Sequence, residues 1–390
     1  MSDRTAKTAA KKRLGTMDKK ALQLRKETYF QLSSQLARLN NAQLQALFPN
    51  DGFSLGWGQN HAIALGQSQV FVKRIPVTDI EYHHLLSTQN LYDLPTYFNY
   101  GIGSVGLGVF RELMTHLKTT HWVLEEENTS FPLMFHYRIL PLSMQSKEVN
   151  LDQIKRFVEY WGNCGEIEAY MLDRAEANHE LALFLEYVPQ TLDRWLQSNP
   201  GESQRNLGSL CNTIAFLRSK GIIHFDAHFG NVLTDGEQIY LTDFGLVLDR
   251  SFALSEEERI FFHQNADYDY GEILLNLGHL ILSVYDLCSE SSKSRLIEKY
   301  NIQKDLGPSQ VRKLLLENIE SIQAEGTMSL DRSYVASIVK YRSIIDLMHD
   351  FLADMSRNPR KDTVFPQVKL RSLLEETGFL SEFESSTHTF

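Results

Sequence analysis

The chain has 390 residues, of which 43% are hydrophobic and 23% charged, as in an ordinary globular protein of one large or two medium domains. Its net charge of −10 argues against general nucleic-acid binding, because a surface that coats phosphates needs a basic excess. Three scattered cysteines, no apolar signal stretch at the start and no segment apolar enough to span a bilayer together predict a soluble cytoplasmic protein.

The first part of the chain combines a basic arm with a helical pattern. Residues 1–26 carry nine Lys or Arg against two Asp. We interpret this arm as a solvated, frayed segment, with a localisation or docking segment as the alternative. Helical periodicity over residues 18–48 stops at the turn-forming P-N-D-G sequence at 49–52. We therefore assign residues 1–48 to a basic arm and a helical N-terminal extension.

Residues 49–188 are predicted to be rich in strands. The expected elements are strands within 53–77 separated by glycines, an amphipathic helix over 109–124, a strand over 131–142, a helix over 152–177 and a buried strand over 180–188. This range is assigned to a first lobe.

Residues 189–390 are predicted to be mostly helical. Helical patterns cover 192–196, 206–220 with Gly221 as C-cap, and most of 255–378, while two short strands meet at an Asp235-Gly236 turn. A strand-rich lobe followed by a helical lobe gives an α+β, bilobal fold, and ligands bind in the clefts between such lobes.

The chemistry is concentrated in the sequence H-F-D-A-H-F-G-N at 224–231. Two kinds of site would use it: a metal site with ligands from His224, Asp226 and His228, or a phosphoryl-transfer loop. The sequence D-F-G follows twelve residues after Asn231, at 243–245. Phosphoryl transfer needs a metal-held triphosphate and a carboxylate that orients the acceptor hydroxyl, and these two motifs supply both.

The order H-x-D-x-x-x-x-N and then D-F-G resembles the protein-kinase-like superfamily, over roughly residues 53–290. The resemblance implies that ATP and Mg²⁺ are the cofactors. It implies that Asp226 is the catalytic aspartate, that Asn231 and Asp243 bind magnesium, and that His224 supports the loop. The chain is most similar to atypical bacterial kinase-like proteins that share the H-F-D-A-H-F-x-N loop and D-F-G.

The same resemblance suggests residues for the nucleotide. Lys73 in Q-V-F-V-K-R is similar to the strand lysine that binds the phosphates, and the backbone at Gly56 and Gly58 would approach them. The segment 184–196 is similar to the hinge, whose backbone would meet the adenine. The hinge residues are Glu186, Tyr187 and Val188.

A helix carboxylate is expected to hold Lys73. Glu112 is our choice, because it lies on the amphipathic helix over 109–124. Glu81 is the alternative, but it follows Lys73 by only eight residues, which leaves little chain for a turn and a helix.

The sequence departs from the protein-kinase pattern in four places. Phe225 replaces the usual arginine, which makes control by a phosphorylated activation segment doubtful, and His61 stands where a third glycine is expected. His228 replaces a common lysine and resembles the loops of aminoglycoside and choline kinases, so we keep it among the catalytic candidates. Residues 248–262 contain no A-P-E-type segment, so a docking platform for peptides is not evident.

The resulting hypothesis is an ATP- and Mg²⁺-dependent kinase that phosphorylates a hydroxyl group. We expect a protein serine or threonine as the acceptor, with a small molecule as the alternative. A pseudokinase that binds nucleotide without turnover, and a metal hydrolase built on His224, Asp226 and His228, are the other hypotheses. The metal hydrolase would leave Lys73, Asn231 and D-F-G unexplained.

Overall fold

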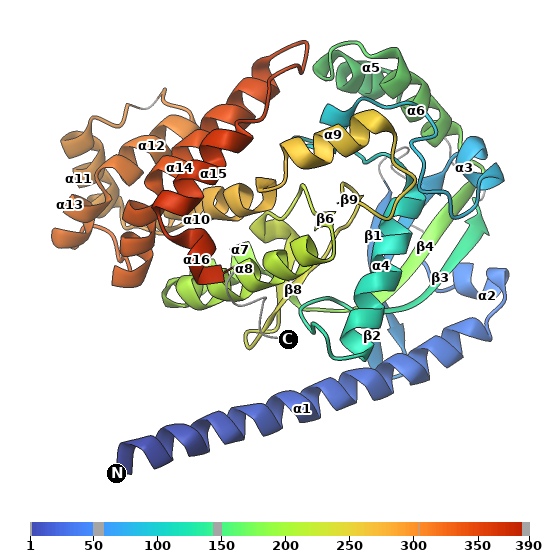
Figure 1. Ribbon diagram of the computed structural model, residues 1–390, viewed down its shortest axis with the longest axis horizontal. Helices are drawn as coiled ribbons and strands as arrows, with labels where there is room; N and C mark the ends of the chain where they lie inside the picture. Colours follow the sequence, from blue (N-terminus) through green and yellow to red (C-terminus); the bar gives the residue numbers. More distant parts are fainter. Residues whose placement is uncertain (1, 50–57, 143–149, 304, 384–390) are drawn as a thin grey trace. The chain divides into compact units, whose positions relative to one another are not determined.

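The computed structural model describes residues 2–49, 58–142, 150–303 and 305–383, and for residues 2–18 only the course of the backbone (Figure 1). Contacts divide the chain into two compact units. The first comprises Met1–His83, Leu113–Asn150 and Leu172–Tyr187, and the second comprises His84–Glu112, Leu151–Met171 and Val188–Phe390. Residues 84–112 and 151–171 therefore make their contacts within the second unit, although in sequence they lie between strands of the first.

The first unit contains a four-stranded antiparallel sheet in the order β1-β2-β4-β3 (Figure 1). The strands are β1 (Gln59–Leu65), β2 (Ser68–Val77), β3 (Met134–Pro141) and β4 (His179–Glu186). Gly66, with a φ of 64°, allows the tight turn that joins β1 to β2. Lys73 lies on the inner strand β2, opposite Asn60 of β1 and Leu183 of β4.

The first unit also contains the helices α1 (Ser2–Ala37), α2 (Asn41–Gln45) and α3 (Asp79–His83), the part of α4 (Val109–Leu124) that begins at Leu113, and the end of α6 (Gly165–Glu176) from Leu172 onward. The helix predicted over 18–48 is thus two helices, because the side chain of Asn40 caps a new start by accepting a hydrogen bond from the backbone N–H of Gln43. Helix α1 also reaches back to Ser2, so the backbone of the basic arm is helical.

Helix α1 packs on strand β3. Leu32 and Leu36 are buried, and the hydroxyl of Ser33 donates a hydrogen bond of 2.6 Å to the carbonyl oxygen of Phe135. The part of α1 from Lys19 onward is therefore built into the first unit.

The segment 152–177 is helical as predicted, but it does not form a single helix. It is divided into α5 (Leu151–Tyr160) and α6 (Gly165–Glu176). Gly162 and Asn163 have φ values of 81° and 58°, and two successive left-handed residues end a right-handed helix.

The second unit is mostly helical and is built around the apolar helix α10 (Tyr268–Asp286). This helix packs against α8 (Ser203–Ser219), α12 (Pro308–Glu317) and α14 (Arg332–Arg357). Its other helices include α5, the 3₁₀ helices η1 (Thr96–Asn99), η3 (Pro200–Glu202) and η4 (Phe229–Asn231), and the helices α7 (Leu192–Ser198), α9 (Glu256–Gln264), α11 (Glu290–Tyr300), α13 (Ile319–Ala324), α15 (Gln367–Glu376) and α16 (Phe379–Phe383). Gly221, with a φ of 79°, follows the end of α8 as predicted.

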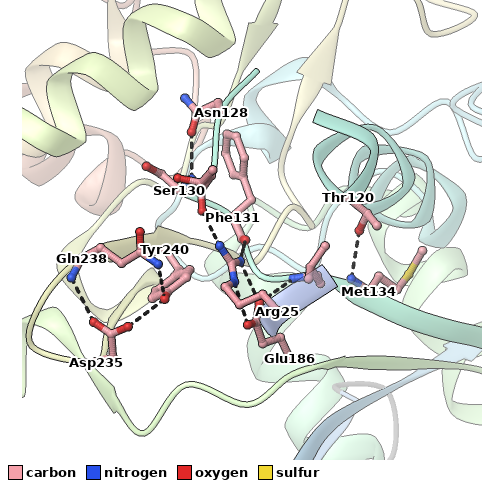
Figure 2. Close-up of polar contacts among 12 residues, drawn as sticks. Arg25, Thr120, Asn128, Ser130, Phe131, Met134, Glu186, Asp235, Gln238 and Tyr240 are labelled. Atoms are coloured by element: carbon pink, nitrogen blue, oxygen red, sulfur yellow. Dashed lines mark hydrogen bonds and ion pairs between the residues drawn. The ribbon is translucent and has the colours of Figure 1, made fainter. Parts of the chain in front are cut away.

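Two small sheets in this unit carry the sequence motifs. Strands β5 (Gln190–Thr191), β7 (Val232–Thr234) and β8 (Ile239–Leu241) form one, and β6 (Ile222–Ile223) and β9 (Leu248–Asp249) form the other. The β7–β8 turn is held by Asp235, whose carboxylate accepts hydrogen bonds from the backbone N–H of Gln238 and from the hydroxyl of Tyr240 (Figure 2).

The predicted α+β fold, with a strand-rich first part and a helical second part, is confirmed. In the part of the chain that the structure describes, no helix combines the length and apolarity needed to cross a membrane.

Candidate functional site

Asp226 and Asn231 lie close together in the loop between β6 and β7, entirely within the second unit. The side-chain amide of Asn231 donates hydrogen bonds to the Oδ2 atom of Asp226 at 2.8 Å and to the carbonyl oxygen of Asp226 at 3.0 Å. These two bonds fix the orientation of the carboxylate. Because the amide nitrogen of Asn231 is used in this way, its carbonyl oxygen is the atom suited to a cation.

His224 is fully buried and supports this loop. Its Nδ1 atom accepts the backbone N–H of Asp226 at 3.3 Å, and its Nε2 atom lies 3.0 Å from the carbonyl oxygen of Thr242. A carbonyl can only accept, so the ring proton lies on Nε2. Burial lowers the pKa of His224 to about 4, although the nearby carboxylate of Asp243 opposes this shift.

The contacts of His224 bear on the metal-site hypothesis. Both of its ring nitrogens are engaged with backbone groups, so the imidazole has no lone pair to give to a metal ion. Among the described residues, no group of three or more His, Cys, Asp and Glu is arranged to hold a metal ion. His224 thus acts as a support between the two motifs.

Two buried carboxyl groups of α10 hold the loop from below. Asp269 accepts the backbone N–H groups of His224 and Phe225 at 2.8 and 2.9 Å, and Glu272 accepts that of Ala227 at 2.7 Å. Burial raises the pKa of Asp269 to about 6, and burial together with the charge of Asp226 raises that of Glu272 well above its usual range. Sequence reasoning missed both residues; the signal was an acidic pair three residues apart in an otherwise apolar helical stretch.

His228 borders the carboxylate of Asp226 on the solvent side. Its side chain is 43% exposed, and its Nε2 atom lies 3.8 Å from the Oδ1 atom of Asp226. Its Nδ1 atom accepts the backbone N–H of Gly230 at 3.0 Å, which caps η4 and fixes the ring. The imidazole therefore has a fixed orientation and borders the Oδ1 atom of Asp226.

The D-F-G turn is joined to the loop by a backbone bond. The backbone N–H of Thr242 donates a hydrogen bond of 3.0 Å to the backbone carbonyl oxygen of Asn231. Asp243 is the next residue in the chain after Thr242. Asp243 has a φ of 61°, and the ring of Phe244 is fully buried. Asn231 and Asp243 thus lie on either side of one backbone hydrogen bond. An amide oxygen and a carboxylate are donors that suit Mg²⁺.

The two glutamates considered as partners of Lys73 differ in their surroundings. Glu81 is part of the cap of α3: its Oε2 atom accepts the backbone N–H of Thr78 at 3.0 Å, and the hydroxyl of Thr78 accepts the N–H of Glu81. Glu112 is buried, and its Oε2 atom would lie 3.5 Å from a Cβ atom built on Gly245 of the D-F-G turn. Lys73 belongs to the first unit and Glu112 to the second, and their pairing stays a prediction.

A glycine-rich segment that sequence reasoning missed lies against both motifs. A Cβ atom on Gly101 would stand 2.2 Å from the Oδ1 atom of Asp226, and one on Gly106 would stand 2.2 Å from the carbonyl oxygen of Gly245. Real Cβ atoms do not come this close to other atoms, so only glycine fits at these two positions. The signal was present in the sequence, because G-I-G-S-V-G at 101–106 has the spacing G-x-G-x-x-G.

The residues predicted to bind the nucleotide lie mainly in the first unit. Gly58, with a φ of 81°, precedes β1, and a Cβ atom there would stand 2.8 Å from the carbonyl oxygen of Arg74, so local geometry alone requires a glycine. Glu186 ends β4, Tyr187 ends the first unit and Val188 begins the second. Gly56 lies outside the described residues.

No protein-family model matches this sequence, and no curated protein sequence matches it. Solved structures that resemble the chain include one described as "WaaP in complex with acyl carrier protein", with a TM-score of 0.33 and 10% sequence identity. That match covers 74% of this chain and 90% of the other. Similarity at this level carries no argument about chemistry, so inference about the reaction depends on the residues of the site.

Proposed function

We propose that the protein is a Mg²⁺- and ATP-dependent phosphotransferase that acts on a hydroxyl group. The observation that carries this proposal is the bond from the Asn231 amide to the Oδ2 atom of Asp226, in a loop bonded to Thr242 immediately before Asp243. The carboxylate of Asp226 is oriented to accept a proton, and the side-chain oxygen atoms of Asn231 and Asp243 would serve as ligands for the metal ion. Phosphoryl transfer needs these parts, because its catalysis is mostly positioning and charge stabilisation.

Asp226 would orient the acceptor and take its proton. Its Oδ2 atom is occupied by Asn231, so the acceptor hydroxyl approaches Oδ1, between Gly101 and His228. A new bond forms between the acceptor oxygen and the γ-phosphorus, the bond from that phosphorus to the β,γ-bridging oxygen breaks, and ADP leaves. The hydroxyl proton passes to the carboxylate of Asp226 as the acceptor oxygen gives an electron pair to the γ-phosphorus.

The carbonyl oxygen of Asn231 and the carboxylate of Asp243 would hold magnesium, which when bound neutralises charge on the phosphates. Lys73 would bind the phosphates, and Glu112 would hold Lys73. His224 would link the segment that carries Asn231 to the segment that carries Asp243. Its lowered pKa keeps the imidazole neutral, and a charged imidazole beside the metal ion would repel that ion.

The acceptor is proposed to be a protein serine or threonine, with a small-molecule alcohol as the second candidate. The position of His228 favours the second candidate, because a fixed imidazole beside Asp226 narrows the approach to the carboxylate.

Incubation with Mg–ATP, alone and with cell extract, followed by mass spectrometry of proteins and metabolites, tests the proposal and identifies the acceptor. Asp226→Ala should still give a nucleotide-induced thermal shift but transfer no phosphate, whereas Glu257→Gln, an exposed change in the same unit, should behave as the wild type. Phosphotransfer retained in Asp226→Ala would overturn the proposal. A wild-type protein that binds nucleotide and never yields ADP would instead establish the pseudokinase.

A further inference from the structure

The guanidinium of Arg25, on α1, is bound to the end of β4 in the first unit (Figure 2). Its Nε and Nη2 atoms donate to the Oε1 and Oε2 atoms of Glu186, each at 2.8 Å. Its Nη1 and Nη2 atoms also donate to the carbonyl oxygens of Thr129 and Phe131, at 3.0 and 2.7 Å. This fork geometry is specific to arginine, since lysine offers a single point of contact.

Glu186 makes hydrogen bonds with Leu133 in addition to those with Arg25. Its Oε2 atom also accepts the backbone N–H of Leu133 at 3.0 Å, and its own N–H donates to the carbonyl oxygen of Leu133 at 2.7 Å. The carboxylate of Glu186, one of the three predicted hinge residues, is therefore engaged within the first unit. A nucleotide contact at this position would use the backbone.

The neighbouring ion pair on the same helix is of a different kind. The side chains of Arg25 and Glu186 are 10% and 17% exposed, whereas Lys26 binds Glu126, whose side chain is 58% exposed. An exposed pair contributes little, while removal of one partner from a largely buried pair leaves the other without compensation. Lys26 thus provides a matched control for Arg25.

We propose that Arg25 is a positioning residue for nucleotide binding, acting through Glu186 on the backbone of Tyr187 and Val188. Glu186 is the last residue of β4, and the two residues after it form the predicted adenine-binding edge. Arg25 fixes where that edge begins by holding Glu186 against the chain between α4 and β3. The inference rests on the proposed function and adds the N-terminal helix to the nucleotide site.

Steady-state ATP turnover, calorimetric binding of Mg–ADP and thermal melting test the role of Arg25. Arg25→Ala should raise both KM for ATP and Kd for Mg–ADP about tenfold, which corresponds to about 1.4 kcal/mol, with kcat changed less than about threefold. Lys26→Ala should match the wild type. Arg25→Lys, which keeps the charge and tests the fork if Arg25→Ala folds poorly, should be intermediate.

A double-mutant cycle separates positioning from general destabilisation. If Arg25 acts through Glu186, the variant with both Arg25→Ala and Glu186→Ala should have the same Kd as the worse single variant. A purely structural role predicts a lower melting temperature and a smaller active fraction at unchanged KM, and that result would overturn the inference. A wild-type protein that does not bind Mg–ADP would overturn the proposed function itself, whereas binding that is insensitive to Arg25 would overturn only the role of Arg25.

Discussion

The backbone of Gly101 lies against the carboxylate of Asp226. A Cβ atom on Gly101 would stand 2.2 Å from the Oδ1 atom and 3.0 Å from the carbonyl oxygen of Phe225. The segment is fixed on either side: the hydroxyl of Tyr100 donates to Asn265 at 2.8 Å, and the hydroxyl of Tyr160 donates to the carbonyl oxygen of Ile102 at 3.0 Å. These hydrogen bonds hold the glycine-rich segment in place, so the contact of Gly101 with the carboxylate sets the position of the Oδ1 atom.

Gly101→Ala should inactivate the protein without unfolding it. The added methyl group must displace Oδ1, and a displacement of about 1 Å at a reacting group lowers turnover about a hundredfold. Phosphotransfer measured beside a thermal melt checks this. Gly165→Ala is the control, because a Cβ atom there meets nothing within 4 Å. Normal turnover in Gly101→Ala would show that Oδ1 is not the atom that meets the acceptor.

Asn231 is expected to have two separable roles. Asn231→Ala removes both the hydrogen bond to Asp226 and the proposed metal ligand, so kcat should fall and the Mg²⁺ concentration at half activity should rise. A hydrogen bond to a charged group contributes about 1.5–3 kcal/mol, so the kcat effect should be about 10- to 100-fold.

Asn231→Asp distinguishes these roles. It restores an oxygen ligand but has no N–H to donate to Asp226, so the Mg²⁺ requirement should recover while kcat stays low. Activity measured over a range of Mg²⁺ concentrations gives both values. Full recovery of kcat in Asn231→Asp would contradict the orienting role of the amide.

The local elements and the spacing of the motifs could be predicted from the sequence. The helix over 109–124 is amphipathic along its length and forms as predicted, because its periodicity and its packing agree. The D-x-x-x-x-N and D-F-G spacings singled out Asp226, Asn231 and Asp243 as candidates. The short hairpin of β7 and β8 connects the two motifs.

The support of the site was not predictable in the same way. Asp269 contacts the loop from more than 40 residues away, and Gly101 from more than 100, so only tertiary packing brings them to Asp226. The break after α5 was missed because glycine is tolerated inside helical patterns. Hydrophobic periodicity does not reveal the left-handed conformation of Gly162 and Asn163.

The buried ion pair of Arg111 and Glu258 should be important for stability. Their nearest atoms are 2.6 Å apart, and both side chains are only 1% exposed. Glu258→Ala leaves the buried guanidinium without its carboxylate, and it also removes the hydrogen bond that this carboxylate accepts from the backbone N–H of Ser255. It should therefore cost about 3–5 kcal/mol of unfolding free energy. Urea denaturation checks this, with the adjacent exposed Glu257→Ala expected to stay within about 0.5 kcal/mol. Equal stabilities would mean that the pair is not formed in solution.

The buried His224 should make stability depend on pH between about 4 and 6.5. Its pKa is about 4 in the folded protein against 6.5 for an ordinary histidine. Below pH 6.5 the unfolded chain takes up a proton that the folded chain refuses until pH nears 4. The unfolding free energy therefore falls as pH is lowered through this range, by up to about 3 kcal/mol. Asp269 acts in the opposite direction, because its pKa is raised from 3.8 to about 6, and its contribution is lost as pH rises through this range.

His224→Gln separates the two effects, because glutamine can donate to the carbonyl of Thr242 but does not titrate. Urea denaturation of both proteins at pH 7 and pH 5 gives the difference in unfolding free energy at each pH, in which the contribution of Asp269 cancels. The advantage of the wild type should shrink at pH 5 by about 2 kcal/mol, since each pH unit below 6.5 changes the histidine contribution by up to about 1.4 kcal/mol. A difference that stays constant between the two pH values would mean that the pKa of His224 is not lowered in the folded protein.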